Sequence, residues 1–254
     1  MRTRLIGLMG HAGSGKDTAA DVIVKQTFGK KIGFAEPLKD LVGHVFGFSH
    51  KTLYGPSQYR NRVDQRYLPK ERFLDKHYRK VPKHVQTRID TRTNRIIWFS
   101  DWCNKYEIDK VSSNALQIKH GGWLDEILTQ PQISARFALQ HLGEWVRLHV
   151  NENFWLKIAL NRAKSLQQDG YGVVVISDCR YLNEAKAIQK AGGEVWRINR
   201  NGAGLSGDVA KHSSEVEQND PLMDELVTLD INNNGTLSDF KIKVANLANA
   251  VRNG

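Results

Sequence analysis

Residues 10–18, GHAGSGKDT, combine glycines, a lysine and an aspartate at a spacing suited to binding phosphate. The pattern G-x-x-x-x-G-K ends on a lysine, which can reach outer phosphates as a point charge. The glycines let the backbone wrap around an anion, so that consecutive N–H groups point at phosphate oxygens. We therefore expect this loop to bind the phosphates of a nucleotide through Gly10, Gly13, Gly15 and Lys16.

Asp17 occupies the position at which such loops usually carry the hydroxyl that coordinates Mg²⁺. A carboxylate is a hard oxygen ligand and can take that role. Thr18 is the second candidate, although one residue along a helix is turned by about a quarter of a circle. In an alternative interpretation, Asp17 only favours the positive N-terminus of the helix that follows. We predict that Asp17 and Thr18 belong to the nucleotide and metal site, with a metal role for Asp17, direct or through water.

The loop follows a compact apolar run at residues 3–9 and precedes a segment with apolar residues at helical spacing. The run predicts a buried strand and the segment predicts a helix, the context that a phosphate-binding loop requires. Further predicted strands and helices alternate to the end of the chain, with strands at residues 171–178 and 194–200 and a strand that runs into a turn within residues 226–235. A helix is expected to begin near Pro37, which is tolerated in the first turn of a helix, and to end near Gly47. This alternation predicts an α/β fold, an open and mostly parallel sheet flanked by helices.

A second candidate site follows the β-branched run YGVVVISD, where ISDCR places Asp178 and Arg180 at the end of a predicted central strand. Open α/β sheets bind their ligands at the carboxyl ends of their strands. Asp178 can hold Mg²⁺ or its water shell, and Arg180 can stabilise a phosphoryl group during transfer. An ion pair that only caps the strand is the alternative.

A third candidate lies on the predicted helix ISARFALQHLGEWVRLHV. Arg136 and Gln140 are four residues apart and share one helix face, with Arg147 close to the same face three turns on. Such a row suits an anionic ligand, although a solvated basic face has the same spacing. The polar segment KHSSEVE adds His212 and Glu215, which alone indicate little.

The charge balance fits anionic partners. The chain has 254 residues and carries 37 Lys and Arg against 27 Asp and Glu, a net charge of +10. A basic excess suits nucleic acid or small phosphorylated substrates and does not choose between them. The two cysteines lack the spacing of a disulfide framework or a metal site. Apolar runs are too short for a signal peptide or a membrane span, so we expect a soluble cytoplasmic protein.

The middle of the chain, at about residues 50–130, has weak patterning and reads as a basic insertion in a single domain that spans residues 1–254. Within it, RTNRIIWFSD suggests a turn and a short strand, half of a hairpin. The basic residues are Arg60, Arg62, Arg66, Lys70, Arg72, Lys76, Arg79, Lys80, Lys83, Arg88, Arg92 and Arg95. We interpret the stretch as a solvated insertion, used as a lid or in the contacts of a homodimer.

Taken together, the motifs resemble the phage deoxynucleoside monophosphate kinase family, within the P-loop nucleotide kinases. They occur in order across nearly the whole chain, outside the basic stretch, and the family's loop also carries G-K-D-T. The matching segments are GLMGHAGSGKDTAAD, FAEPLKDLVGHVFG, LYG at residues 53–55, ARFALQHLG, NFWLKIAL, VVISDCRYLNEAKAIQKAGGEVWRINR, HSSE and INNNGTLSDF.

The resemblance implies transfer of the ATP γ-phosphate to a deoxynucleoside 5′-monophosphate (dNMP), with Mg²⁺, a helical acceptor-binding part and an arginine-bearing lid. On this basis the predicted catalytic residues are Lys16, Asp178, Arg180 and Arg136, and the metal residues are Asp17, Thr18 and Asp178. The predicted acceptor-binding residues are Phe34, Lys39, Arg136, Gln140 and Trp155. From composition alone, Trp155 is as readily a core residue.

The sequence departs from the family in one motif. The family commonly shows L-G-T-[DE] after the arginine helix, whereas Gly143 is followed directly by Glu144. This puts roles for Glu144 and Arg147 in doubt. Two other functions are kept open: a P-loop kinase for phosphomevalonate or dephospho-coenzyme A, and an ATP-dependent nucleic-acid-binding protein. The latter would use aromatic and basic residues of the insertion, including Tyr59, Tyr67, Phe73 and Tyr78; we do not expect nucleic acid as the partner.

Overall fold

The computed structural model describes residues 4–67, 89–90, 95–96, 99–116, 122–130, 132–204 and 216–253. The chain forms two compact units. Unit 1 comprises Met1–Phe34 and Leu156–Gly254, and unit 2 comprises Ala35–Trp155. Each unit is described by itself below. The prediction of a single domain with a basic insertion stays a prediction.

Unit 1 is built on a five-stranded sheet with the order β2-β5-β1-β6-β7. Its strands are β1 (Arg4–Met9), β2 (Lys30–Ile32), β5 (Val173–Ile176), β6 (Glu194–Asn199) and β7 (Leu229–Asn232). Every neighbouring pair is parallel. The α/β prediction with an open parallel sheet is confirmed.

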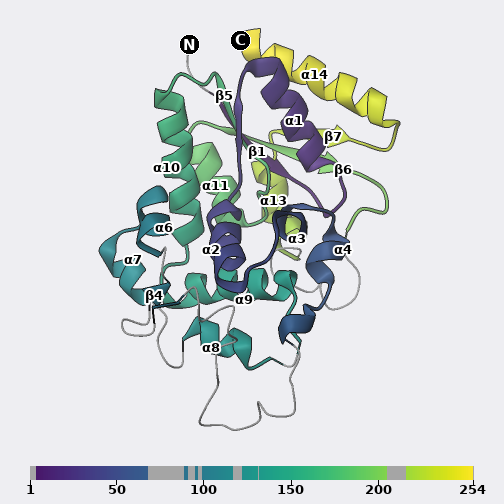
Figure 1. The fold of residues 1–254 in the computed structure, drawn as a ribbon. Helices are drawn as coiled ribbons and strands as arrows, with labels where there is room; N and C mark the ends of the chain where they lie inside the picture. Colours follow the sequence, from purple (N-terminus) through teal and green to yellow (C-terminus); the bar gives the residue numbers. More distant parts are fainter. Residues whose placement is uncertain are drawn as a thin grey trace. The chain divides into compact units, whose positions relative to one another are not determined.

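The two faces of this sheet are apolar, because successive side chains along a strand point to opposite faces. In β1, Leu5 and Met9 face one core while Ile6 and Leu8 face the other. Helices α10 (Phe154–Gln168), α11 (Leu182–Lys190) and α13 (Pro221–Leu226) cover the first face. Helices α1 (Lys16–Thr27) and α14 (Leu237–Asn253) pack on the second (Figure 1). Burial on both faces explains the near-continuous apolar runs of β1 and β5.

The described part of unit 2 is helical, apart from a two-stranded antiparallel pair of β3 (Ile89–Asp90) and β4 (Arg95–Ile96). This pair confirms the hairpin that RTNRIIWFSD suggested. The longer helices, α2 (Glu36–Phe46) and α9 (Ala135–His149), match their predicted positions. The shorter helices are α3 (His50–Tyr54), α4 (Ser57–Asn61), α6 (Phe99–Lys105), α7 (Lys110–Ala115) and α8 (Trp123–Leu128), with a 3₁₀ turn, η1, at Gln65–Tyr67.

Helix α2 packs closely on α9 and α6. A Cβ at Gly143 would lie 3.2 Å from Leu38, so the small residue permits close approach of α9 to α2. The Trp102 indole N–H donates to the Pro37 carbonyl at 3.0 Å, and the Tyr106 hydroxyl donates to Asp40 at 2.6 Å. These contacts fix the helix that carries the predicted acceptor residue Lys39.

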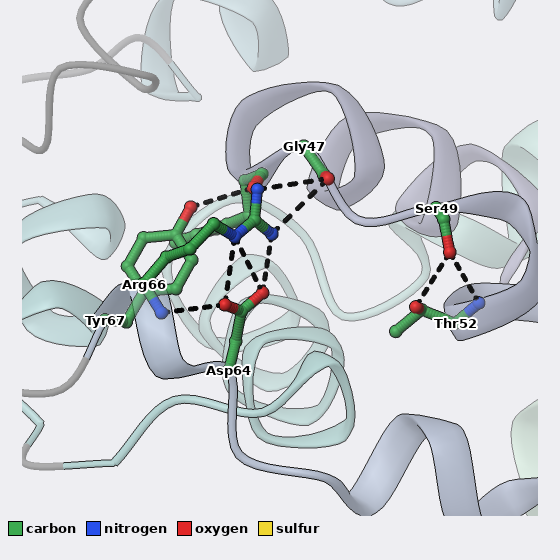
Figure 2. A network of polar contacts seen from close by, with 7 residues as sticks. Gly47, Ser49, Thr52, Asp64, Arg66 and Tyr67 are labelled. Atoms are coloured by element: carbon green, nitrogen blue, oxygen red, sulfur yellow. Dashed lines mark hydrogen bonds and ion pairs between the residues drawn. The ribbon is translucent and has the colours of Figure 1, made fainter.

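The described part of the basic stretch uses arginines to hold its own backbone. Figure 2 shows the Arg66 guanidinium between the Asp64 carboxylate and the Gly47 carbonyl, with Nε 2.9 Å from Asp64 Oδ1. Arg60 donates to the carbonyls of Leu53 at 3.1 Å and Gly55 at 2.8 Å. The predicted basic residues at 70–88 and Arg92 lie outside the described residues, as do Phe73 and Tyr78. Among the described helices, none has the length and apolar character required to cross a membrane.

Candidate active site

The phosphate-binding loop connects the carboxyl end of β1 to the start of α1. Gly10, Gly13 and Gly15 have φ angles of 135°, 81° and 108°, which only glycine adopts readily. At Gly10 a side chain is also excluded by space, because a Cβ would lie 2.4 Å from the Ile198 carbonyl oxygen. At Gly13 a Cβ would meet nothing within 4 Å, so the loop is open there. The predicted strand, loop and helix are confirmed in this order.

Lys16 is the first residue of α1, and its side chain lies back along the loop. Its ammonium donates to the carbonyl of Gly10 at 2.5 Å and to that of His11 at 2.8 Å. The residue is only 9% exposed. The positive charge is therefore held beside the backbone that the glycines shape, where the first amides of α1 also favour an anion.

Asn233, the residue after β7 in the segment INNNG, stabilises the phosphate-binding loop through a hydrogen bond. Its side-chain amide donates to the Ser14 carbonyl at 2.7 Å, and both residues are buried. A Cβ at Gly15 would lie 2.5 Å from the same amide nitrogen, so this position is closed to larger residues. The segment INNNG belongs to the family resemblance, but no role was predicted for Asn233 from the sequence.

The Asp17 carboxylate points away from the protein, with 85% of its side chain exposed, and pairs with Lys31 at 3.1 Å. Lys31 also pairs with Asp21 at 3.0 Å. Burial lowers the pKa of Lys31, but the two carboxylates outweigh this effect and raise it. Thr18 is half-buried on the next position of α1. An exposed carboxylate at the edge of the loop is accessible to a hydrated metal ion.

Asp178 is the second residue after β5, at the same edge of the sheet as the loop. Its Oδ1 accepts a hydrogen bond from the Phe34 amide at 2.7 Å. The next residue, Cys179, donates its amide to the Leu8 carbonyl at 3.0 Å, which ties the segment to the end of β1. The Phe34 ring is 4% exposed and belongs to the sheet's core. Phe34 thus contacts Asp178 through its backbone amide. A contact between its ring and the base of the acceptor nucleotide stays a prediction.

Arg180 is half-buried, and the backbone around it is held by Glu184 of α11. One carboxylate oxygen of Glu184 accepts from the amides of Arg180 at 2.8 Å and Tyr181 at 3.0 Å. Burial, helped by the charge of Asp178, raises the pKa of the Glu184 carboxyl to about 8 against the lowering effect of these two amides. Glu184 was not among the residues predicted from the sequence. The signal was a glutamate three residues after the residue that precedes the helix, the spacing of a capping box.

Four predicted acceptor-binding residues lie in unit 2. Arg136 and Gln140 are half-buried on α9, one turn apart, and Arg136 Nε donates to Asn61 of α4 at 2.5 Å. The Lys39 ammonium lies 4.5 Å from the centre of the Tyr54 ring. Trp155 is 7% exposed, and its indole N–H donates to the Gly143 carbonyl at 3.2 Å.

The structure therefore brings Lys16, Asp17, Thr18, Asp178 and Arg180 to one edge of the unit 1 sheet. Among the described residues, no group of three His, Cys, Asp or Glu could hold a metal by itself. His212 and Glu215 lie outside the described residues.

Three known proteins are similar to this chain. A protein of Acanthamoeba polyphaga mimivirus, provisionally named deoxynucleotide monophosphate kinase, is 28% identical over 93% of this chain and 91% of its own length. The deoxynucleoside-5′-monophosphate kinase of Escherichia phage T5 is 27% identical over 73% of this chain and 72% of its own. A solved dephospho-CoA kinase from Campylobacter jejuni covers 98% of both chains with a TM-score of 0.46 and 10% identity.

The sequence model of the family described as deoxynucleotide monophosphate kinase matches residues 4–244. That match includes the phosphate-binding loop, the segment with Asp178 and Arg180, and helix α9. It favours the predicted nucleotide kinase over the two other functions that the sequence left open. The chain belongs to the deoxynucleotide monophosphate kinase family.

Proposed function

We propose that the chain transfers the γ-phosphate of ATP to a dNMP and so yields ADP and the corresponding diphosphate. An oxygen of the acceptor's phosphate attacks the γ-phosphorus, and the bond from that phosphorus to the β–γ bridging oxygen breaks. Such transfer needs little covalent chemistry from the protein, and catalysis consists of positioning and charge stabilisation. The observation that carries the proposal is the edge of the unit 1 sheet, where the glycine loop and Lys16 lie beside Asp178 and Arg180.

On the donor side, we propose that the loop amides and the ammonium of Lys16 bind the phosphates of ATP. The ammonium already lies over the loop, on the carbonyls of Gly10 and His11. Ser14 Oγ supports an anionic ligand at this place, because it is buried and has no hydrogen-bond partner among the described residues. A buried hydroxyl left in this way is unusual in folded proteins and calls for a partner such as a ligand.

We propose a Mg²⁺ requirement, with Asp17, Thr18 and Asp178 as the residues nearest the ion. Two carboxylates and a hydroxyl at one edge of the sheet fit an ion that keeps several water molecules and binds substrate phosphates. The ion would neutralise part of the negative charge on the transferred group. The Phe34 amide, which donates to Asp178, orients this carboxylate at the end of β5.

For the acceptor, we propose that unit 2 supplies Lys39, Arg136, Gln140 and Trp155. Arginine and lysine suit the acceptor's phosphate, and a glutamine amide can hydrogen-bond a base edge. Helix α9 presents Arg136 and Gln140 one turn apart, both half-buried. Arg136 and Arg180 are proposed as the cations that stabilise the transferred phosphoryl group.

The test is a coupled assay of ADP release with Mg-ATP and each of the four dNMPs, run beside the four ribose counterparts. We expect ADP release only in the presence of particular dNMPs. A slow release that is indifferent to every acceptor would overturn the proposal. If DNA raised such a release, the ATP-dependent nucleic-acid-binding function would replace it.

A further inference from the structure

A short 3₁₀ turn, η4 (Glu217–Asn219), contacts both loops of the candidate site within unit 1. Each of its three consecutive side chains has a partner there. Glu217 Oε2 accepts the Leu182 amide at 3.1 Å, and Gln218 Oε1 accepts the Gly10 amide at 3.3 Å. Asn219 Oδ1 lies 3.1 Å from His11 Nε2. Two of these contacts are on the phosphate-binding loop, and one is at the start of α11.

Gln218 is the buried member of the three, with only 6% of its surface exposed. Its partner is the amide of the residue that begins the glycine loop, and the carbonyl of that same residue accepts from Lys16. Both polar groups of Gly10 are therefore fixed by side chains. An uncharged acceptor suits this place, since a carboxylate so close to the bound phosphates would repel them.

Glu217 holds the backbone of the second segment of the site, which follows Asp178 and leads into α11. The first amides of a helix have no partner within the helix and need one from elsewhere. Glu184 accepts the amides of Arg180 and Tyr181, and Glu217 accepts the next amide, that of Leu182. The backbone that follows Asp178 is thus held by two glutamate side chains, Glu184 from its own helix and Glu217 from η4.

We infer that η4 is a brace that positions the phosphate-binding loop and the segment with Asp178 and Arg180, and that Gln218 is a positioning residue for the donor phosphates. The inference rests on the proposed function, because it concerns the same site. It adds a residue whose role is to hold the loop's backbone, and it predicts an effect on ATP that exceeds any effect on the acceptor.

The test compares Gln218→Met with Gln189→Met. Methionine has a similar length and no strong acceptor, so Gln218→Met removes the hydrogen bond to the Gly10 amide with little change in side-chain length. The control alters a glutamine of α11 whose amide donates to the Leu226 carbonyl at 2.8 Å, away from both loops. We expect Gln218→Met to bind ADP about tenfold more weakly and to raise KM for ATP similarly, as the loss of one buried hydrogen bond predicts. KM for the dNMP should change less than twofold, and the control should match the wild type.

A second measurement follows the Gly10 amide by NMR hydrogen exchange in protein labelled with ¹⁵N-glycine. We expect faster exchange at Gly10 in Gln218→Met than in the wild type, with the other glycine amides of unit 1 unchanged. Equal exchange rates and equal affinities for ADP in the two proteins would overturn the inference. If Gln218→Met does not fold, Gln218→Asn takes its place, because its acceptor is drawn back by one carbon and the site stays polar.

The two proposals fail in different ways. If the wild type releases no ADP with any dNMP, the proposed function fails, while ADP binding and Gly10 exchange still report on the brace. If the wild type is active and Gln218→Met has the same KM for ATP, the same ADP affinity and the same Gly10 exchange, the brace fails and the function stands.

Discussion

Replacing Glu184 by glutamine should make the protein's stability less dependent on pH. Glu184 is 7% exposed, and its carboxyl accepts two backbone amides beside Arg180. Burial raises its pKa from the ordinary value of 4.5 to about 8. The folded protein therefore holds a proton on Glu184 at a pH where the unfolded chain has released it. Glutamine keeps a carbonyl acceptor for both amides and carries no charge at any pH.

The sign follows from proton linkage. Between pH 4.5 and about 8 the folded state binds more protons at Glu184 than the unfolded state, so the free energy of unfolding falls as pH rises. The contribution is complete below pH 4.5 and is lost as pH rises through about 8. At about 1.4 kcal/mol for each pKa unit, the loss between pH 5 and pH 8 is at most about 3 to 4 kcal/mol.

Urea denaturation followed by circular dichroism, at pH 5 and at pH 8, measures this difference. We expect the wild type to lose more free energy of unfolding over that interval than Glu184→Gln. The control is Glu225→Gln, which makes the same change at an exposed position of α13 and should keep the pH dependence of the wild type. Parallel pH dependence in the wild type and Glu184→Gln would refute the reasoning, because it would show that Glu184 ionises normally in the folded protein.

Four further substitutions test the site and the packing of unit 2. Lys16→Ala should lower kcat by at least about 100-fold, because it removes a charge that is held over the phosphate-binding loop. Arg136→Ala and Arg180→Ala should each lower kcat by on the order of 1000-fold in the ADP-release assay, and unchanged turnover in both would contradict their proposed roles. Tyr106→Phe removes the 2.6 Å hydrogen bond to Asp40 and should lower the free energy of unfolding by about 1 kcal/mol, whereas an unchanged urea midpoint would contradict this.

The elements with strong local patterns could be predicted from the sequence. The β-branched run at β5 and the glycine-bounded run at β1 indicated buried strands, and both lie within the predicted ranges. Helix α2 begins at Glu36, one residue before the predicted start at Pro37, and ends just before Gly47. Proline favours the first turn of a helix and glycine favours the position after its last turn. The strand order was not predicted, since periodicity does not show which strands become neighbours.

The short helices of unit 2 were the main omission. Helices α6, α7 and α8 contain 7, 6 and 6 residues, too few turns for a 3.6-residue repeat to stand out. Their apolar residues are nevertheless decisive for packing. Trp123 and Ile127 of α8 are fully buried. A segment without a recognisable sequence pattern can thus contribute to the hydrophobic core, because burying two or three large side chains stabilises a short helix against its neighbours.

The residues of the candidate site also differ in how far they could be predicted from the sequence. Lys16, Asp17 and the pair of Asp178 and Arg180 belong to local motifs, in which neighbouring residues already specify the chemistry. Gln218 and Asn233 could not be found in this way, because their partners in the phosphate-binding loop lie 208 and 219 residues away. An amide side chain in a polar segment can pair with almost any backbone group, so only the folded chain selects its partner. The local motifs therefore indicate which atoms we propose for the chemistry, while long-range contacts to the backbone of Gly10 and Ser14 hold the loop on which those of Lys16 lie.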